Sequence, residues 1–300
     1  MAYERCVKYI AEYWEKIICF SPEDRDVHIG LPHHFLSPND TYFKDDEFYW
    51  DSYFIALGML ATGEKYHIHL IKGVIENFCF LFRKYGIIPL RNKLYNLGIS
   101  QPPFLSSLMM EVYAHTHDKL QLREWAVVIE GELNKYWMND HHKIAPILSR
   151  YCDHEITDVT AEHESGWDMT SRFNENCLNY LPIDLNSLLY KYETDLEKIY
   201  RILGDEEKAR HYEVRAHLRR KEIHRLNWNE AEGFYFDHDL NKQRPVSFYS
   251  LAGFYPLWAG LATPDQAAKM VVQLGRFERA GGLANTQEHE LSEKYKQWDH

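Results

Sequence analysis

Residues 164–173 read Glu-Ser-Gly-Trp-Asp-Met-Thr-Ser-Arg-Phe, so that Asp168 directly follows a Gly-Trp pair. The glycine permits a tight bend of the backbone, and the indole of Trp167 supplies an apolar wall. Against such a wall a carboxyl group loses hydration, which favours its neutral, proton-donating form. Protonation of a leaving oxygen near neutral pH requires an acid in that state. Asp168 is therefore the candidate general acid, although it could also cap a helix. Arg172 is expected to hold this loop by pairing with a carboxylate.

Residues 48–54, Phe-Tyr-Trp-Asp-Ser-Tyr-Phe, again frame an acid with aromatic rings. Aromatic rings can cover the C–H faces of a sugar, and carboxylates can accept its hydroxyl protons. Trp50 and Asp51 could also be a core indole beside a helix-capping acid. Because two such stretches occur in one chain, the sequence indicates a glycoside hydrolase that binds a small carbohydrate.

The composition is that of an ordinary globular protein. Of the 300 residues, 45% are hydrophobic and 26% are charged, and the formal net charge is −11. Phosphate binding needs clustered Lys and Arg, so we expect no nucleic-acid partner. Aromatic residues reach 15%, including 21 Tyr and 8 Trp, which suits carbohydrate binding. The sequence leaves the oligomeric state open.

Cysteine usage and hydropathy bear on the cellular compartment. The 5 cysteines are scattered without a CxxC spacing and are odd in number, which is typical of reduced thiols in the cytosol. The N-terminus leads directly into an amphipathic pattern and shows no signal-peptide apolar region. No run approaches the ~18 apolar residues needed to cross a bilayer. We therefore expect a cytoplasmic protein without a membrane partner.

Hydrophobic periodicity predicts an almost entirely helical chain. Apolar residues recur at helical spacing over 3–19, 51–62, 65–84, 102–117, 119–137, 183–203, 205–225, 247–260 and 264–277. Residues 226–240 alternate apolar and polar positions around a glycine, which predicts a small hairpin or an extended arm. Long loops after alternate helices favour a toroid with an inner and an outer ring of helices. No linker indicates a second domain, so residues 1–300 are predicted to form a single all-α domain.

Ordered motifs along the chain resemble those of the trehalase family and of related glycoside hydrolases with an (α/α)6 barrel. The matching stretches follow the family order and are residues 48–54, 100–104 (Ser-Gln-Pro-Pro-Phe), 164–173, 182–188, 281–283 and 297–299. The resemblance implies an all-α (α/α)6 toroid of the six-hairpin glycosidase type. The chain has fewer helical segments than that toroid, and its last residues look like an interrupted functional loop. We therefore expect the C-terminal helices to lie beyond His300.

By this resemblance Asp168 is the general acid of an inverting mechanism. The implied sugar-binding residues are Trp50, Asp51, Gln101, Gly166, Trp167, Trp298 and Asp299. Gln101 precedes two prolines and could instead only shape a turn. The family's general base is a Glu well after the second signature, so it is expected beyond His300. If the base lies within the chain, its candidates are Glu288, Glu290 and Glu293.

Several positions of the family pattern are occupied by other residues. Trehalases carry Arg where this chain has Phe43 and Ile99, and Asn where it has Leu90. No Arg-Pro-Glu segment precedes Asp168. An Arg fork makes paired hydrogen bonds that Ile or Phe cannot replace. These differences favour, as an alternative to trehalose, the glucosylglycerate or mannosylglycerate that shorter relatives hydrolyse. A sugar-binding pseudoenzyme or an inactive fragment is the alternative of another class.

The remaining polar clusters admit weaker interpretations. Asp237 and Asp239 could bind a ligand or a cation, but a solvated arm is the simpler expectation. The His pairs at 33–34 and 141–142, and His154, invite comparison with metal ligands. No HExxH motif or spaced triad accompanies them. We expect no metal, no cofactor and mostly surface histidines.

Overall fold

The computed structural model describes residues 2–168, 170–289 and 299. The chain divides into two compact units, and each is described by itself. The first unit comprises residues 1–100 and 104–128, and the second comprises residues 101–103 and 129–300. None of the helices within the described ranges is long and apolar enough to cross a membrane.

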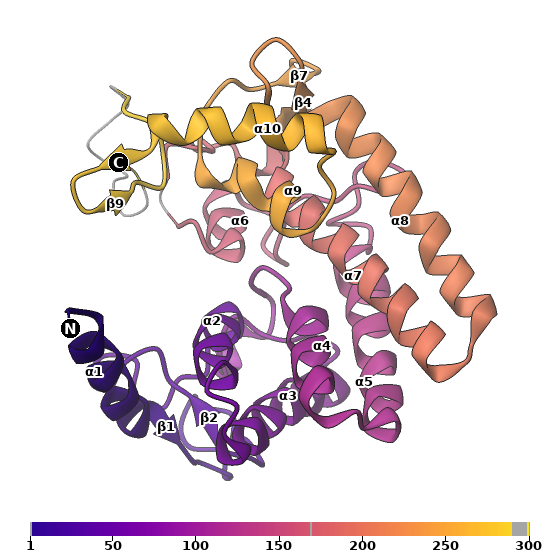
Figure 1. Cartoon of the computed structure of the whole chain (residues 1–300). Helices are drawn as coiled ribbons and strands as arrows, with labels where there is room; N and C mark the ends of the chain where they lie inside the picture. Colours follow the sequence, from indigo (N-terminus) through magenta and orange to yellow (C-terminus); the bar gives the residue numbers. More distant parts are fainter. Residues whose placement is uncertain (1, 169, 290–298, 300) are drawn as a thin grey trace. The chain divides into compact units, whose positions relative to one another are not determined.

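The first unit is built from helices with one short strand pair (Figure 1). Its elements are α1 (Ala2–Ile17), β1 (Ile18–Cys19), β2 (Phe35–Leu36), α2 (Tyr49–Leu60), α3 (Lys65–Tyr85), η1 (Leu94–Asn96), α4 (Leu105–Thr116) and the start of α5 (Lys119–Gly131). Strands β1 and β2 pair antiparallel, with Cys19 opposite Phe35. Helix α3 ends where Gly86 adopts φ 76°, a left-handed conformation that favours glycine.

Aromatic packing fixes the first turn of α2 in this unit. Tyr49 packs against Phe78 of α3 with ring centroids 5.1 Å apart, and Tyr53 stacks on Phe104 at 4.6 Å. The Tyr49 hydroxyl accepts a hydrogen bond from the backbone N–H of Leu105 at 3.3 Å. Because these contacts join α2 to α3 and to the start of α4, the polar residues on the first turn of α2 have a rigid support.

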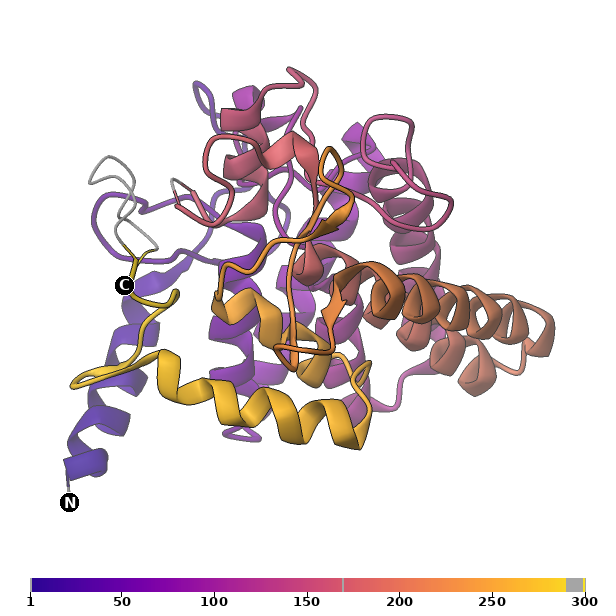
Figure 2. The ribbon, with the colours of Figure 1, turned by 90° about the horizontal axis from the view of Figure 1, so that it is seen from above.

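The second unit is organised around a long helical hairpin. Helices α7 (Ile183–Leu203) and α8 (Glu206–Asn227) run antiparallel and pack side by side (Figures 1 and 2). The turn between them uses Gly204 at φ 78° and Asp205, whose side chain accepts from the Lys208 N–H. A left-handed glycine followed by an N-cap acid is sufficient to reverse the chain within two residues.

Short elements complete the second unit. The helical ones are η2 (Glu132–Trp137, a π-helical turn), α6 (Asp158–Ser165), η3 (Cys177–Asn179), η4 (Leu251–Phe254), α9 (Tyr255–Trp258), α10 (Pro264–Val272) and η5 (Gln273–Arg276). The strands are β3 (Tyr180–Leu181), β4 (Trp228–Asn229), β5 (Phe234–Tyr235), β6 (His238–Asp239), β7 (Arg244–Pro245), β8 (Glu278–Arg279) and β9 (Gly282–Leu283). Strands β4 and β5 form an antiparallel hairpin, and β6 lies between β3 and β7.

Most predicted elements are confirmed, with two exceptions. The hairpin expected within 226–240 is present as β4 and β5. A continuous helix over 247–260 was the wrong prediction, because only η4 and the short α9 form there. Helix α6 was not predicted, since its sequence is polar and lacks an apolar period. Its boundaries come from local chemistry, with Thr157 as N-cap and Gly166 in the left-handed C-cap. All 5 cysteines are free thiols, as expected.

Glu47, just ahead of α2, is a buried carboxyl group that links stability to pH. It is 1% exposed, and its backbone N–H donates to Asn92 Oδ1 at 2.8 Å. Burial raises the pKa of Glu47 well above its ordinary value, and the nearby Asn77 amide offsets only part of that rise. The folded protein therefore holds a proton that the unfolded chain releases above about pH 4.3, so this group destabilises the fold as pH rises from there.

Glu47→Gln is expected to make the protein more stable at pH 8 by about 1 kcal/mol or more, because the amide carries no charge to bury. Urea unfolding at pH 4.5 and pH 8 measures this, and the gain should nearly vanish at the lower pH. The exposed Glu15→Gln is the matched control and should show no such difference. A Glu47→Gln protein less stable than the wild type at pH 8 would contradict the assignment.

Candidate active site

Asp168 lies shortly after the C-terminal residue of α6, Ser165. Gly166 adopts φ 71° and its N–H donates to the His163 carbonyl at 3.2 Å, which ends the helix. Ser165 Oγ then accepts the Trp167 N–H at 3.0 Å and donates to the Glu162 carbonyl at 2.6 Å. We call residues 166–173, of which 169 is not described, the acid loop. Its first turn is therefore set by local hydrogen bonds of the helix end.

The environment of Asp168 favours the neutral acid. The side chain is half-buried. Burial raises the pKa of Asp168 above its ordinary value, while the charge of His163 and its own backbone N–H lower it to a smaller extent. The upward shift of the Asp168 pKa agrees with the prediction from the Gly-Trp-Asp motif. Such an acid keeps its proton to higher pH than an exposed Asp, as proton donation to a leaving group requires.

A buried ionic network holds the acid loop downstream of Asp168. Arg172 donates to Asp184 at 2.7 and 3.0 Å and to Asp237 at 2.7 and 2.8 Å. Its side chain is 1% exposed. Burial opposes the charge on Arg172, but the two carboxylates outweigh it and raise the arginine pKa well above its ordinary value. The expected pairing of Arg172 with a carboxylate is confirmed, and we call this set the Arg172 anchor.

The same carboxylate fixes the residue before the acid. Trp167 Nε1 donates to Asp184 Oδ2 at 2.9 Å, and Tyr151 Oη lies 3.3 Å from that oxygen. The Arg172 guanidinium lies 5.5 Å from the Trp167 ring centroid. Asp184 at the start of α7 thus binds residues on both sides of Asp168. Sequence reasoning placed Asp184 in a family motif but gave it no role, although an acid in the first turn of a helix was the available signal.

The solvated arm expected around Asp237 and Asp239 is the wrong prediction. Asp237 is 8% exposed and Asp239 is 2% exposed. Besides Arg172, Asp237 accepts the Ile183 N–H at 2.9 Å. Asp239 lies on β6 between two other strands and accepts from Asn179 at 3.0 Å. The alternating pattern predicted the β4–β5 hairpin but gave no sign that β6, which holds Asp239, pairs with β3 and β7.

Asp299 lies against the acid loop from a distant part of the sequence. Its carboxylate accepts from Thr170 Oγ1 at 3.1 Å, from the Ser171 N–H at 3.1 Å and from Ser171 Oγ at 2.7 Å. His289 Nε2 is 3.6 Å from it. The structure therefore places Asp299 against Thr170 and Ser171 of the loop that contains Asp168. The predicted sugar contact of Trp298 falls outside the described residues.

Glu162 is a second titrating carboxyl group beside the acid loop. It is buried on α6, and burial raises its pKa to about 7. The backbone N–H groups of Thr170 and Glu175 oppose this rise, while the charge of Asp158 adds to it. A pH profile of this site near neutrality therefore contains a contribution from Glu162.

The other predicted residues divide between the two units. Trp50 and Asp51 lie in the first turn of α2 and are half-buried, with the Trp50 ring edge-on to Phe54 at 6.2 Å. Just before them Asp46 is buried and pairs with Arg91 and Lys93, each at 3.0 Å. These pairs fix the segment that enters α2.

Gln101 belongs to the second unit and is 5% exposed. The adjacent Ser100 in the first unit donates to the Ile88 carbonyl at 2.7 Å. Of the positions that depart from the trehalase pattern, Ile99 is buried and Phe43 is exposed, with its ring edge-on to Phe48 at 5.3 Å. Neither side chain can supply the paired hydrogen bonds of an arginine.

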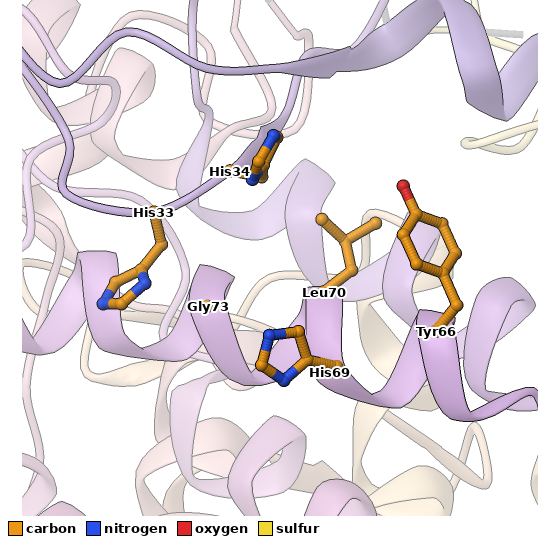
Figure 3. A pocket seen from close by; sticks show the side chains of 6 residues that line it. All are labelled: His33, His34, Tyr66, His69, Leu70 and Gly73. Atoms are coloured by element: carbon orange, nitrogen blue, oxygen red, sulfur yellow. The ribbon is translucent and has the colours of Figure 1, made fainter.

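A surface hollow of about 270 Å³ lies elsewhere in the first unit, over α3. It is lined by His33, His34, Tyr66, His69, Leu70 and Gly73 (Figure 3). The buried Asn77 fixes its rim, accepting from the His33 N–H at 3.0 Å and donating to the His33 and His34 carbonyls. In the part of the chain that the structure describes, no set of three or more His, Cys, Asp or Glu side chains is arranged to hold a metal ion.

Several known proteins are similar in sequence to this chain. Residues 24–164 and 149–300 match the family model described as Trehalase. A cytosolic neutral trehalase of Beauveria bassiana is 31% identical over 90% of this chain and 46% of its own length. A periplasmic trehalase of Salmonella dublin is 29% identical over 88% of this chain and 54% of its own length. The chain thus spans about half the length of these curated relatives.

Solved structures show the same fold. Neutral trehalase Nth1 from Saccharomyces cerevisiae superposes with a TM-score of 0.77 and 26% identity, covering 89% of this chain and 60% of that one. A GH63 mannosylglycerate hydrolase from Thermus thermophilus gives a TM-score of 0.68 at 16% identity, covering 97% of this chain and 83% of that one. The predicted fold class, the (α/α)6 toroid of glycosidases, is confirmed. With its family model matched over most of the sequence, the chain belongs to the trehalase family.

Proposed function

We propose that this chain supplies the acid half of an inverting glycosidase that cleaves an α-linked glucoside. The observation that carries the proposal is Asp168, a half-buried acid with a raised pKa at a helix end, followed by the Arg172 anchor. Its proton passes to the glycosidic oxygen as the bond to the anomeric carbon breaks. A water molecule, deprotonated by a general base, attacks that carbon from the opposite face.

The general base is proposed to lie in the part of the relatives that this chain does not span. Inversion requires two carboxyl groups about 6.5–9.5 Å apart, with water between the base and the sugar. Of the candidates within the chain, Glu288 is exposed, which does not suit a base that must bind one ordered water molecule. Glu290 and Glu293 lie outside the described residues.

We propose α,α-trehalose as the substrate, because the curated relatives are trehalases. Glucosylglycerate or mannosylglycerate is the second candidate, and the apolar residues Phe43 and Ile99 favour it because they replace two arginines of the trehalase pattern. The relatives include cytosolic and periplasmic enzymes, and five free cysteines support the cytoplasm for this chain. The partner is a small carbohydrate rather than a nucleic acid.

Hydrolysis of these three glycosides, with the product anomers followed by NMR, tests the proposal. Initial release of a β anomer from one α-linked glycoside would name the substrate and place a functioning base within the chain. Retention of the α configuration alone would overturn the inverting mechanism. Sugar binding without turnover of any of the three would favour the alternative class, a sugar-binding protein that lacks its base.

Asp51→Ala is expected to weaken trehalose binding by about tenfold or more, because a hydrogen bond to a charged group contributes about 1.5–3 kcal/mol. Isothermal titration calorimetry measures the affinity. The exposed Glu111→Gln on α4 is the control and should bind trehalose as the wild type does. An affinity unchanged by Asp51→Ala would remove Asp51 from the sugar site.

A further inference from the structure

His142 is a buried histidine whose two ring nitrogens both face hydrogen-bond acceptors. The residue is 2% exposed, and its Nδ1 is 3.0 Å from Asn139 Oδ1. That oxygen also accepts the backbone N–H groups of His141 and His142, each at 2.9 Å, which identifies it as the acceptor end of the amide. An unprotonated Nδ1 would direct its lone pair at this oxygen. The contact is favourable only when Nδ1 carries a proton.

The opposite nitrogen faces a carboxylate. His142 Nε2 lies 3.1 and 3.3 Å from the two oxygens of Glu164, which is fully buried. Glu164 also accepts the Tyr136 hydroxyl and the Cys152 N–H, the latter at 2.7 Å. Burial favours neutral Glu164, but His142 and these hydrogen bonds outweigh it and lower the glutamate pKa. A carboxylate opposite Nε2 and an amide oxygen opposite Nδ1 are both matched by a ring that carries a proton on each nitrogen.

This ion pair lies upstream of the candidate acid. Glu164 occupies the last turn of α6, immediately before the acid loop, and His142 follows η2 in the chain. The His142 ring packs against Tyr136 at 4.6 Å and Trp137 at 5.2 Å between centroids. The groups facing it are therefore one carboxylate, one amide and two aromatic rings. Ion pairs therefore hold the chain on either side of Asp168. The Glu164–His142 pair holds the helix end before the acid loop, and the Arg172 anchor holds the loop after Asp168.

We propose that His142, as a cation paired with Glu164, is a positioning residue that fixes the end of α6 and thereby the placement of Asp168. The proposal rests on the proposed role of Asp168 as proton donor. A positioning role follows because the pair contacts the helix that delivers the acid rather than the acid itself. Small displacements of a catalytic group reduce the rate of reaction far more than they reduce binding.

The charge on His142 is tested directly by nitrogen NMR on the whole chain labelled with ¹⁵N-histidine. At pH 7.5 both ring nitrogens should resonate as protonated nitrogens, and the signal is assigned by its loss in His142→Gln. In Glu164→Gln, Nε2 should shift to the position of an unprotonated nitrogen, because no carboxylate remains to hold the proton. An unprotonated ring nitrogen in the wild type, whether Nδ1 or Nε2, would overturn the proposal. This measurement needs no turnover, so its outcome does not depend on whether the proposed function is correct.

Kinetics test the positioning role. In the protein that includes the proposed general base, His142→Gln should lower kcat on the hydrolysed glycoside about 10- to 100-fold while KM changes less than about twofold. His141→Gln alters the exposed neighbour and should leave both constants unchanged. Circular dichroism confirms that each variant is folded, and Glu164→Gln should reproduce the loss of kcat if His142→Gln is unstable. An unchanged kcat in a folded variant would overturn the positioning role. A loss of kcat/KM that comes entirely from a rise in KM would overturn it as well.

Discussion

In a protein that also carries the proposed general base, Asp168→Asn is expected to lower kcat for glycoside hydrolysis by about a thousandfold while sugar affinity changes less than about twofold. General acid catalysis contributes about 10²- to 10⁴-fold, and the amide cannot donate a proton to the leaving oxygen in the way the acid does. The amide does match the neutral acid in size and charge. Protonated Asp168, a form that the raised pKa extends to higher pH, presents the sugar with a surface similar to that of Asn.

Steady-state kinetics and calorimetry on the same preparations measure the two effects. The exposed Glu155→Gln, close to α6, is the control and should behave as the wild type does. The pH profile provides a second check, since activity that needs protonated Asp168 falls as pH rises through its raised pKa. Glu162, whose pKa is about 7, could produce the same decline. The decline in activity with rising pH should persist in Glu162→Gln. If the decline is absent from that variant, it is caused by Glu162 and not by Asp168.

Arg172→Met is expected to destabilise the protein by about 3–5 kcal/mol, because it leaves two buried carboxylates without their cation. Asp184 and Asp237 each lose two hydrogen bonds from the guanidinium. Met preserves much of the apolar volume of the Arg stem, so the effect reports the charge and the hydrogen bonds. Urea unfolding followed by circular dichroism and by tryptophan fluorescence measures the loss.

An exposed arginine supplies the comparison. Arg201 contacts Glu197, Glu206 and Glu213 on the surface of the second unit. Arg201→Met should leave the unfolding midpoint nearly unchanged, because exposed ion pairs are screened by water and salt. An Arg172→Met protein as stable as Arg201→Met would contradict the account of the anchor.

Local patterns in the sequence predicted the helices and the acid loop well. Apolar periodicity requires only neighbouring residues, so α3, α7 and α8 appear close to their predicted limits. The loop chemistry is similarly local, because Gly166 and Trp167 adjoin Asp168. The pairing of Arg172 with a carboxylate was also predicted, but its partners Asp184 and Asp237 were not.

Partners that are distant in sequence could not be predicted in this way. Nothing near Asp239 shows that β6 pairs with β3 and β7, and nothing near Asp237 indicates its contact with Arg172, so the burial of both acids was missed. His141 and His142 are adjacent and chemically identical in the sequence, yet one is exposed and the other is buried against Glu164. Only the tertiary fold distinguishes them, because burial depends on segments brought together from elsewhere in the chain.

The most direct test of Asp168 as proton donor compares two substrates in Asp168→Asn. Fluoride leaves a glycosyl carbon without protonation, whereas the sugar oxygen of trehalose must accept a proton as it leaves. The account predicts that the substitution lowers kcat/KM on trehalose about a thousandfold but on α-glucosyl fluoride by less than about tenfold. Equal losses on the two substrates would show that Asp168 acts in some other way and would contradict its assignment as the general acid.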